Sequence, residues 1–342
     1  MKKSLLALAV LGAFAGAASA QTNVTIYGVA DVGLQRIDTT ATSARWGIDS
    51  GIQSGSRIGF RGTEDLGGGL SAIFTLENGY AIDTGALGQG GLLFGRQAWV
   101  GLSSGIGAIK FGRQYTPIHT ALDSIDPFAT GITGDGSGIE AVFRPYGIRM
   151  NNTVNFGTTL AGFNAQVAYG FGEVAGSTSR GSQLGASVGY ANGPINAVFA
   201  YHDQNTVSAA GADTGDGRTA MLGATYDFRV VKAHAAYADN RDESATGTRL
   251  GRSRDAMLGV SVPLGAGTVI ASYVRHDDRF GAGTADADYW GLGYTHSLSK
   301  RTNLYTSYSR IKNDAGSRFG LSTATAAGND VNFINVGVRH RF

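Results

Sequence analysis

The chain has 342 residues, including 53 glycines but only 5 prolines, with 14 tyrosines and 16 phenylalanines, and its mean hydropathy is close to zero. This composition excludes collagen, because glycine has no period of three, and intrinsic disorder, because apolar and aromatic residues are plentiful. Cysteine is absent, which excludes disulfide bonds and thiolate metal sites. Without Lys2 and Lys3, basic residues (28 in the whole chain) balance the 26 acidic ones, so the overall charge does not indicate a nucleic-acid partner.

The first twenty residues have the pattern of a secretory signal peptide. A basic start is followed by a short apolar run, 5–17, and by the small residues Ala18, Ser19 and Ala20. The run is too short for a membrane-spanning helix and ends in a cleavage pattern. We therefore predict a cleaved leader, 1–20, and a single mature domain, 21–342.

The mature chain repeats one unit, in which about ten residues of alternating character are followed by a turn or loop. Alternation with a period of two is typical of strands with one apolar face. In 162–171, for example, Val167 and Tyr169 share one face while Gln166 and Ala168 share the other. The pattern predicts sixteen strands, at 22–34, 55–63, 69–78, 92–103, 106–114, 148–158, 162–171, 182–191, 194–202, 218–228, 230–238, 254–263, 267–276, 287–296, 302–311 and 329–342.

The predicted connections alternate between short and long. Short turns rich in Gly, Asn and Pro occur at 64–68, 160–162 and 192–194, among others. Long connections are predicted between them, at 35–54, 78–91, 115–147, 203–217, 239–253 and 312–328. Short turns on one side and long loops on the other are typical of a bacterial outer-membrane barrel, whereas a soluble β-sandwich has no need of this asymmetry.

The last strand favours the same architecture. In 330–342, Ile334, Val336 and Val338 share one face with the terminal Phe342, and the opposite face carries Arg339 and Arg341. A membrane barrel uses such a strand, since its outer face meets lipid and its inner face meets water. Fold class and localisation are thus predicted as an all-β, 16-stranded antiparallel transmembrane β-barrel in the outer membrane of a Gram-negative bacterium.

Several segments then resemble the general porins of Gram-negative β-proteobacteria. They are TNVTIYGVAD at 22–31, SRIGFRGTEDLGGGL at 56–70, GRQAWVGL at 95–102, FGRQ at 111–114, RMNNTVNF at 149–156 and the final strand. The resemblance covers essentially the whole mature chain. It implies a homotrimer whose third loop folds into each barrel and narrows the pore.

The longest loop, 115–147, occupies the position of that third loop. It contains the candidate constriction acids Asp123, Asp126, Asp135 and Glu140. An exposed outer loop with solvated acids is the alternative from length alone. The resemblance favours folding into the barrel.

A basic wall is expected to face this loop. Strand alternation turns Arg57, Arg61 and Arg149 inward, because an arginine on the lipid face near mid-membrane would cost about 2–4 kcal/mol. Arg96 has ambiguous parity, because Trp99 and Val100 both suit lipid, and it is placed in the wall by the resemblance. The weaker basic candidates, which lie near strand ends, are Arg113, Lys110 and Arg144.

These features predict a water-filled channel for passive diffusion of small hydrophilic solutes and of inorganic or organic anions, within outer-membrane lipid. Arginine walls favour anions, but acids pointing into the slot would favour cations, so the sign depends on their directions. A substrate-specific channel for phosphate or organic acids stays open, as does calcium binding by a loop. No motif indicates an enzyme, a cofactor, a metal site or nucleic-acid binding, and an adhesin with working loops would show no conductance.

Overall fold

The fold is described from a computed structural model. Its described residues are 23–40, 43–132, 140–143, 145–281, 285–320 and 327–342. The predicted leader, 1–20, therefore lies outside the described residues. In the part of the chain that is described, no helix is long and apolar enough to cross a membrane.

Strands dominate the described chain, and all of them belong to one antiparallel sheet. Their bounds are β1 (Asn23–Thr39), β2 (Arg45–Ser50), β3 (Arg57–Gly67), β4 (Leu70–Gly79), β5 (Gln97–Ser104), β6 (Gly107–Tyr115), β7 (Arg149–Leu160), β8 (Phe163–Gly170), β9 (Gln183–Asn192), β10 (Ile195–Val207), β11 (Asp213–Asp227), β12 (Lys232–Ser244), β13 (Arg249–Leu264), β14 (Gly267–Asp278), β15 (Ala287–Ser297), β16 (Thr302–Asn313) and β17 (Val331–Arg341).

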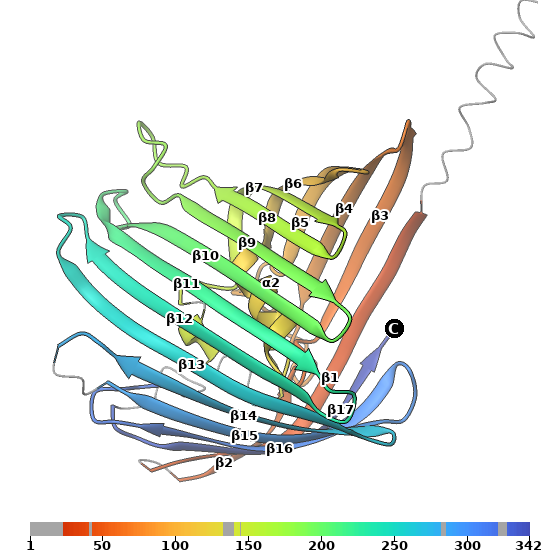
Figure 1. Cartoon of the computed structure of the whole chain (residues 1–342), viewed down its shortest axis with the longest axis vertical. Coiled ribbons are helices and arrows are strands. Elements are labelled where there is room, and N and C mark those ends of the chain that lie inside the picture. Colours follow the sequence, from red (N-terminus) through yellow and green to blue (C-terminus); the bar gives the residue numbers. More distant parts are fainter. Residues whose placement is uncertain (1–22, 41–42, 133–139, 144, 282–284, 321–326) are drawn as a thin grey trace, which may run out of the picture.

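The sheet closes on itself to form a barrel (Figure 1). One edge of β1 pairs with β17, and its other edge pairs with β3 along the first half and with β2 along the second half. Since β2 and β3 share one place, the seventeen described strands fill sixteen places in the wall. The predicted sixteen-stranded barrel is confirmed, and its closure leaves no unpaired sheet edge in lipid.

The terminal aromatic residue takes part in this closure. Backbone hydrogen bonds of 3.1 Å run in both directions between Gly28 and Phe342. A Cβ atom on Gly28 would stand only 2.3 Å from the Phe342 ring. Glycine at this position therefore lets the last side chain lie flat against the first strand.

Alternation between lipid and lumen follows the prediction. In β8, Val167 is exposed on the outer wall while Ala168 is buried inside, and in β13 Leu258 is 64% exposed next to the buried Met257. Figure 1 shows the tight turns on the right, beside the C-terminus, and most of the longer connections on the left. By the usual asymmetry of such barrels, the tight turns mark the periplasmic end.

Three predicted long loops are wrong in extent, because strands occupy much of them. β1 continues to Thr39 and β2 starts at Arg45, so most of 35–54 is strand. Likewise β10 and β11 leave only 208–212 between them, and β12 and β13 leave only 245–248. Backbone hydrogen bonds between strands do not require an apolar face, so the strands stay paired beyond the membrane, where their residues are polar.

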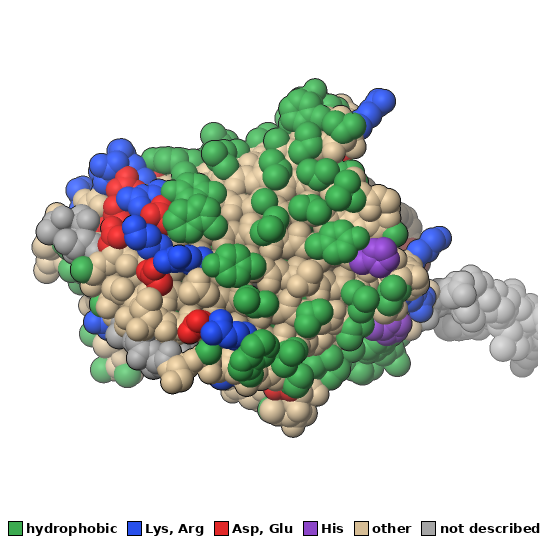
Figure 2. All heavy atoms as spheres, turned by 90° about the horizontal axis from the view of Figure 1, so that it is seen from below, with side chains coloured by type: hydrophobic (Ala, Val, Ile, Leu, Met, Phe, Trp, Pro, Cys, Tyr) green, Lys and Arg blue, Asp and Glu red, His purple; other side chains and the backbone are tan. Residues whose placement is uncertain are grey.

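Ion pairs cover the outer face of the wall at this end, on these extensions and on β14 and β15. Arg218 contacts Asp203 and Asp216, and Asp239 binds Arg241 and Arg252. Arg275 binds Asp286, just before β15, and Asp288 within β15. Figure 2 shows basic and acidic side chains gathered toward one end of the wall, beyond a band of apolar side chains. The charged sequence of these strands, which resembles a loop, thus reflects their place outside the hydrocarbon region.

Aromatic side chains flank the apolar band at both ends. Near the tight turns, the rings of Phe163 and Tyr190 lie 4.7 Å apart and those of Tyr226 and Phe228 lie 4.5 Å apart. Toward the other end, Tyr273 packs against Trp290 at 5.5 Å. Such girdles place amphipathic rings at the two membrane interfaces.

We expect Leu258→Arg to destabilise the barrel by about 2–4 kcal/mol, because the new cation would stand in lipid on the outer wall. Asn164→Arg is the matched control, since Asn164 faces the water-filled interior. The measurement is the denaturant midpoint of the folded protein in lipid vesicles. Equal midpoints for the two variants would contradict the assignment of outer and inner faces.

The described residues of the connection after β6 lie inside the barrel. The connection starts with the helix α2 (Pro117–Ile125), whose N-cap Thr116 accepts a hydrogen bond from His119 N, and continues to the 3₁₀ turn η1 (Glu140–Phe143). The apolar side of α2 packs on buried side chains of the inner wall, among them Val198, Met221 and Ala236. The infolded third loop is confirmed.

Glycines of the inner wall make room for this loop. A Cβ atom on Gly223 would stand 1.9 Å from Ile125, one on Gly259 would stand 2.6 Å from Pro127, and one on Gly293 would stand 2.9 Å from Phe128. The wall and the loop therefore fit together closely along one side. The space beside the loop is lined by residues of β1, β3, β4 and β17 and by Arg96, Tyr115 and Arg149.

Candidate functional site

A space of about 790 Å³ lies between the infolded loop and the opposite wall. Its ionisable lining residues, as far as the structure describes them, include six arginines, one histidine and two acids: Arg57, Arg61, Arg96, Arg149, Arg339, Arg341, His119, Glu77 and Asp123. We call this space the slot. All four arginines expected in the basic wall lie around it.

Arg96 is the most deeply enclosed of these cations, with 7% of its surface exposed. Its Nε donates to Glu77 Oε1 at 2.8 Å, and the hydroxyl of Tyr27 donates to the other oxygen of Glu77 at 2.9 Å. Arg96 precedes β5, and its backbone N–H is held by Glu77 O. One carboxylate therefore neutralises one arginine of the slot and fixes its position.

Arg149 is held without a carboxylate partner among the described ion pairs. Its Nε donates to Arg96 O at 2.8 Å, and its guanidinium lies 4.8 Å from the ring centre of Tyr115. The Tyr115 hydroxyl accepts hydrogen bonds from both Arg96 and Arg149. Two like charges are tolerated this close together because the Glu77 carboxylate pairs with Arg96.

Arg57 and Arg61 enter the slot from β3. Their carrier strand alternates as expected, with Ile58 on the outer wall. Arg61 lies 5.2 Å from the ring centre of Tyr27, which supports its extended position. Aromatic rings and carbonyls thus hold the arginines, while much of their charge stays unneutralised.

We expect Glu77→Gln to strengthen anion preference and to destabilise the protein by about 3–5 kcal/mol. The first effect follows because the slot loses a negative charge. The second follows because Arg96 would lose its buried partner. Zero-current potential and thermal unfolding measure the two effects. A variant with unchanged stability would show that the Arg96–Glu77 pair is dispensable.

The candidate constriction acids differ in their surroundings. Asp123 is exposed, lines the slot and accepts a hydrogen bond from Thr130 Oγ1 at 3.0 Å. Asp126 is buried and accepts from the backbone N–H groups of Phe128 and Thr130, so it organises the loop after α2 instead of facing the slot. Asp135 lies outside the described residues, as does the side chain of Glu140.

The weaker basic candidates also separate. Lys110 points inward, where its ammonium lies 4.7 Å from the ring centre of Trp99, and it lines the space described below. Trp99 thus points inward, while Val100 is 58% exposed on the outer wall, which resolves the parity of this strand. Arg113 binds Gly95 O and the side chain of Asn151 beside an irregularity in strand pairing. Arg144 lies outside the described residues.

Sequence reasoning did not select Arg339 and Arg341 as site residues, although both line the slot. Their signal was present, because alternation in 330–342 already assigned them to the inner face. Glu77 and Tyr115 had no comparable signal. Their importance depends on contacts with arginines from other strands.

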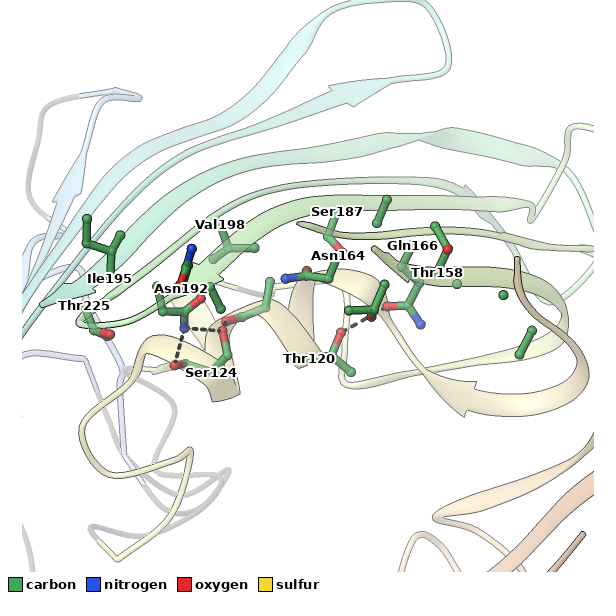
Figure 3. Close-up of a pocket in the computed structure, with 18 of the residues that line it drawn as sticks. Thr120, Ser124, Thr158, Asn164, Gln166, Ser187, Asn192, Ile195, Val198 and Thr225 are labelled. Carbon is green, nitrogen blue, oxygen red and sulfur yellow. Dashed lines mark hydrogen bonds between the residues drawn. The ribbon is translucent and has the colours of Figure 1, made fainter. Parts of the chain in front are cut away.

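A second space, of about 900 Å³, lies on the other side of α2 (Figure 3). Its lining is mainly uncharged and polar, with Asn164, Gln166 and Ser187 on the wall opposite Thr120 and Ser124 of the helix. Thr120 donates to Gln166 Oε1 at 3.1 Å, and Asn196 donates to Ser124 O at 3.0 Å. Residues 103–105 and 192–194 of two tight turns also line it, so it opens toward the periplasmic end.

The two spaces adjoin at α2, since Thr120 lines both. Solutes in the slot therefore meet a polar, water-accessible wall on the way to the periplasmic end. Among the described residues, no group of three His, Asp or Glu side chains is arranged to hold a metal ion. The geometry is that of a narrow passage with an excess of fixed positive charge.

Comparison with known proteins agrees with this geometry. The family model described as "Gram-negative porin" matches residues 7–316. The chain belongs to the Gram-negative porin family. An outer membrane porin protein of Bordetella pertussis is 35% identical, and outer membrane porin protein 32 of Delftia acidovorans is 37% identical, each over the full length of both chains.

Solved porin structures share the fold. The anion-selective porin from Comamonas acidovorans has a TM-score of 0.83 at 33% identity, covering 94% of this chain and 100% of that one. OmpF of Salmonella typhi, at 18% identity and a TM-score of 0.67, shares the fold alone. This porin is therefore an outer-membrane protein of a family of channels.

Proposed function

We propose that this porin is a diffusion channel that prefers anions, with the slot as its selectivity element. The observation that carries the proposal is the lining of the slot, which includes six arginines but, among the described residues, only two acids, Glu77 and Asp123. Glu77 is already engaged by Arg96, so the remaining cations set the sign of the field. The similar porin from Comamonas acidovorans is described as anion-selective, which supports the same sign.

Selectivity follows from electrostatics in a confined passage. Fixed guanidinium groups raise the local concentration of anions and lower that of cations. Water and small hydrophilic solutes pass down their gradients, with no covalent step. The arginines act as fixed charges because guanidinium keeps its proton at any physiological pH.

Exchange of the ions tests this proposal. Replacing chloride by a large organic anion should lower the conductance of the purified protein in a planar bilayer more than replacing potassium by a large organic cation. The reverse order would overturn anion preference and assign control to the acids of the third loop.

A substrate-specific anion channel is the second candidate, favoured by the number of arginines around one slot. Bidentate guanidinium contacts suit phosphate and carboxylate groups. A specific channel would show chloride current that saturates with concentration and is blocked by millimolar phosphate. Linear conductance without block would favour the general channel.

We infer that the protein assembles as a homotrimer, as the family resemblance implies. Large apolar side chains of β1, such as Val24 and Ile26, are exposed on the outer wall and are available for a neighbouring subunit. A solved porin of Vibrio cholerae with the same fold is described as a trimer form. After chemical cross-linking of the protein in detergent, the largest product should contain three chains.

A further inference from the structure

The wall next to β1 is interrupted at the level of the slot. Val29 pairs with Arg57 and Val32 pairs with Ser50, so the two β1 residues between them face the six residues 51–56. We call 51–56 the inner bulge. Gln53, Ser54 and Gly55 of this segment line the slot, which shows that the extra chain projects into the lumen.

The side chain of Asp31 holds the inner bulge through hydrogen bonds to its backbone. This side chain is fully buried, and its Oδ2 accepts hydrogen bonds from Ser54 N at 2.7 Å and from Gln53 N at 3.1 Å. Its Oδ1 accepts from the Tyr305 hydroxyl at 2.7 Å. Ser56 closes the other end, where its hydroxyl bonds both the N–H and the C=O of Asp31.

Tyr305 of β16 reaches Asp31 of β1 across the intervening strand β17. A Cβ atom on Gly337 would stand 2.3 Å from the Tyr305 hydroxyl oxygen, and one on Gly33 would stand 3.0 Å from it. The ring therefore lies flat over inward-facing glycines, and Ile52 of the inner bulge covers Gly33 beside it. The anchor is built from three separate parts of the barrel.

The inner bulge contacts both sides of the slot. On one side, Arg339 donates to Ser54 Oγ at 3.1 Å, and Asn303 links Gln53 to Arg339 through two hydrogen bonds. On another side, a Cβ atom on Gly55 would stand 2.8 Å from Arg96. The segment thus contacts two arginines of the slot, Arg96 and Arg339, which are far apart in the sequence.

The third loop also touches the inner bulge. A Cβ atom on Gly131 would stand 2.0 Å from Gln53 O, so only a residue without a side chain permits this approach. Gly131 of the loop therefore rests on 51–56, while α2 packs on the inner wall at Val198 and Met221. Removing the inner bulge from its place would loosen the loop and two arginines together.

We propose that the inner bulge is a second constricting element of the channel, and that Asp31 is the positioning residue that holds it in the slot. This inference rests on the proposed channel function and adds a determinant of its selectivity outside the third loop. Asp31 acts through hydrogen bonds to the bulge, since its buried carboxylate does not meet the passing ions.

Two substitutions at Asp31 separate position from charge. Asparagine keeps the shape, because its Oδ1 can accept from Gln53 N and Ser54 N while its amide donates to the Tyr305 oxygen. Alanine removes every one of these bonds. We expect Asp31→Ala to lower the anion-to-cation permeability ratio about twofold and Asp31→Asn to leave it near the wild-type value.

The natural absence of cysteine allows a second measurement. Ser54→Cys places a thiol on the inner bulge, and a bulky neutral methanethiosulfonate should reduce single-channel conductance to about half. Thr246→Cys is the matched control, because Thr246 is exposed in the turn between β12 and β13. Labelling of the control should not change conductance.

Each outcome has one meaning. Asp31→Ala with wild-type selectivity, or equal shifts in Asp31→Ala and Asp31→Asn, overturns the positioning role. Labelled Ser54→Cys with unchanged conductance overturns the second constriction, and this test stands even where Asp31→Ala does not fold. A wild-type protein without conductance would instead refute the proposed channel function.

Discussion

Replacing Arg57 and Arg149 together by serine should lower the anion-to-cation permeability ratio about tenfold. Both arginines line the slot, and neither has a carboxylate partner among the described ion pairs. The variant loses two fixed charges where the passage is narrow, while Glu77 and Asp123 remain. The zero-current potential across a planar bilayer in a KCl gradient measures the change.

The control variant removes the same number of positive charges, two, from the outer wall. Arg241 and Arg254 both contact Asp239 outside the barrel, so Arg241→Ser with Arg254→Ser leaves the slot intact. Its potential should equal that of the wild type. Equal shifts in the two double variants would mean that total charge, and not the slot, determines selectivity.

Leu122→Asp should raise single-channel conductance about twofold or more, because it removes the third loop from the inner wall. Leu122 is 1% exposed in the cluster that seats α2. An unpaired carboxylate there would cost several kcal/mol and would disrupt the packing of α2, a helix of nine residues, on the inner wall. Single-channel recording measures the conductance and its noise.

Ser124→Asp is the matched control, since it adds the same charge to the exposed side of the same helix. This variant should keep the wild-type pore size, although its added charge weakens anion preference. If Leu122→Asp conducted no more than Ser124→Asp, the packing of α2 would not determine the width of the channel.

The strand pattern of this porin could be predicted because lipid imposes strict alternation on each segment of the wall. Val167 against Ala168 and Leu258 against Met257 are local signals that need no knowledge of partners. Strand ends could not be predicted in the same way. Polar pairs such as Arg218 and Asp216 stand on strands that leave the membrane, where alternation of hydropathy no longer applies.

Site residues could be predicted from the sequence only where strand alternation applies. Alternation placed Arg57, Arg61 and Arg149 on the inner face, and the family resemblance added Arg96. It could not find Glu77 or Tyr115, whose roles depend on contacts between strands. It also gave no sign that 51–56 projects inward, because a bulge of this size depends on the register of β2 and β3 against β1.

Irregular backbone limited the remaining expectations. Asp126 was a candidate because it is an acid in the third loop, yet the turn after α2 directs its oxygens to Phe128 N and Thr130 N. Arg113 lies within an irregularity in pairing between Gly112 and Gln114, so its direction cannot be counted from Lys110. Alternation predicts direction only within an unbroken ladder.

The most direct test of anion preference in the slot is the zero-current potential of the wild-type protein under a tenfold gradient of KCl. We expect the dilute side to become negative, because chloride crosses the arginine-lined slot faster than potassium. A dilute side that becomes positive would contradict this mechanism, since cations would then carry the current despite the six arginines around the slot.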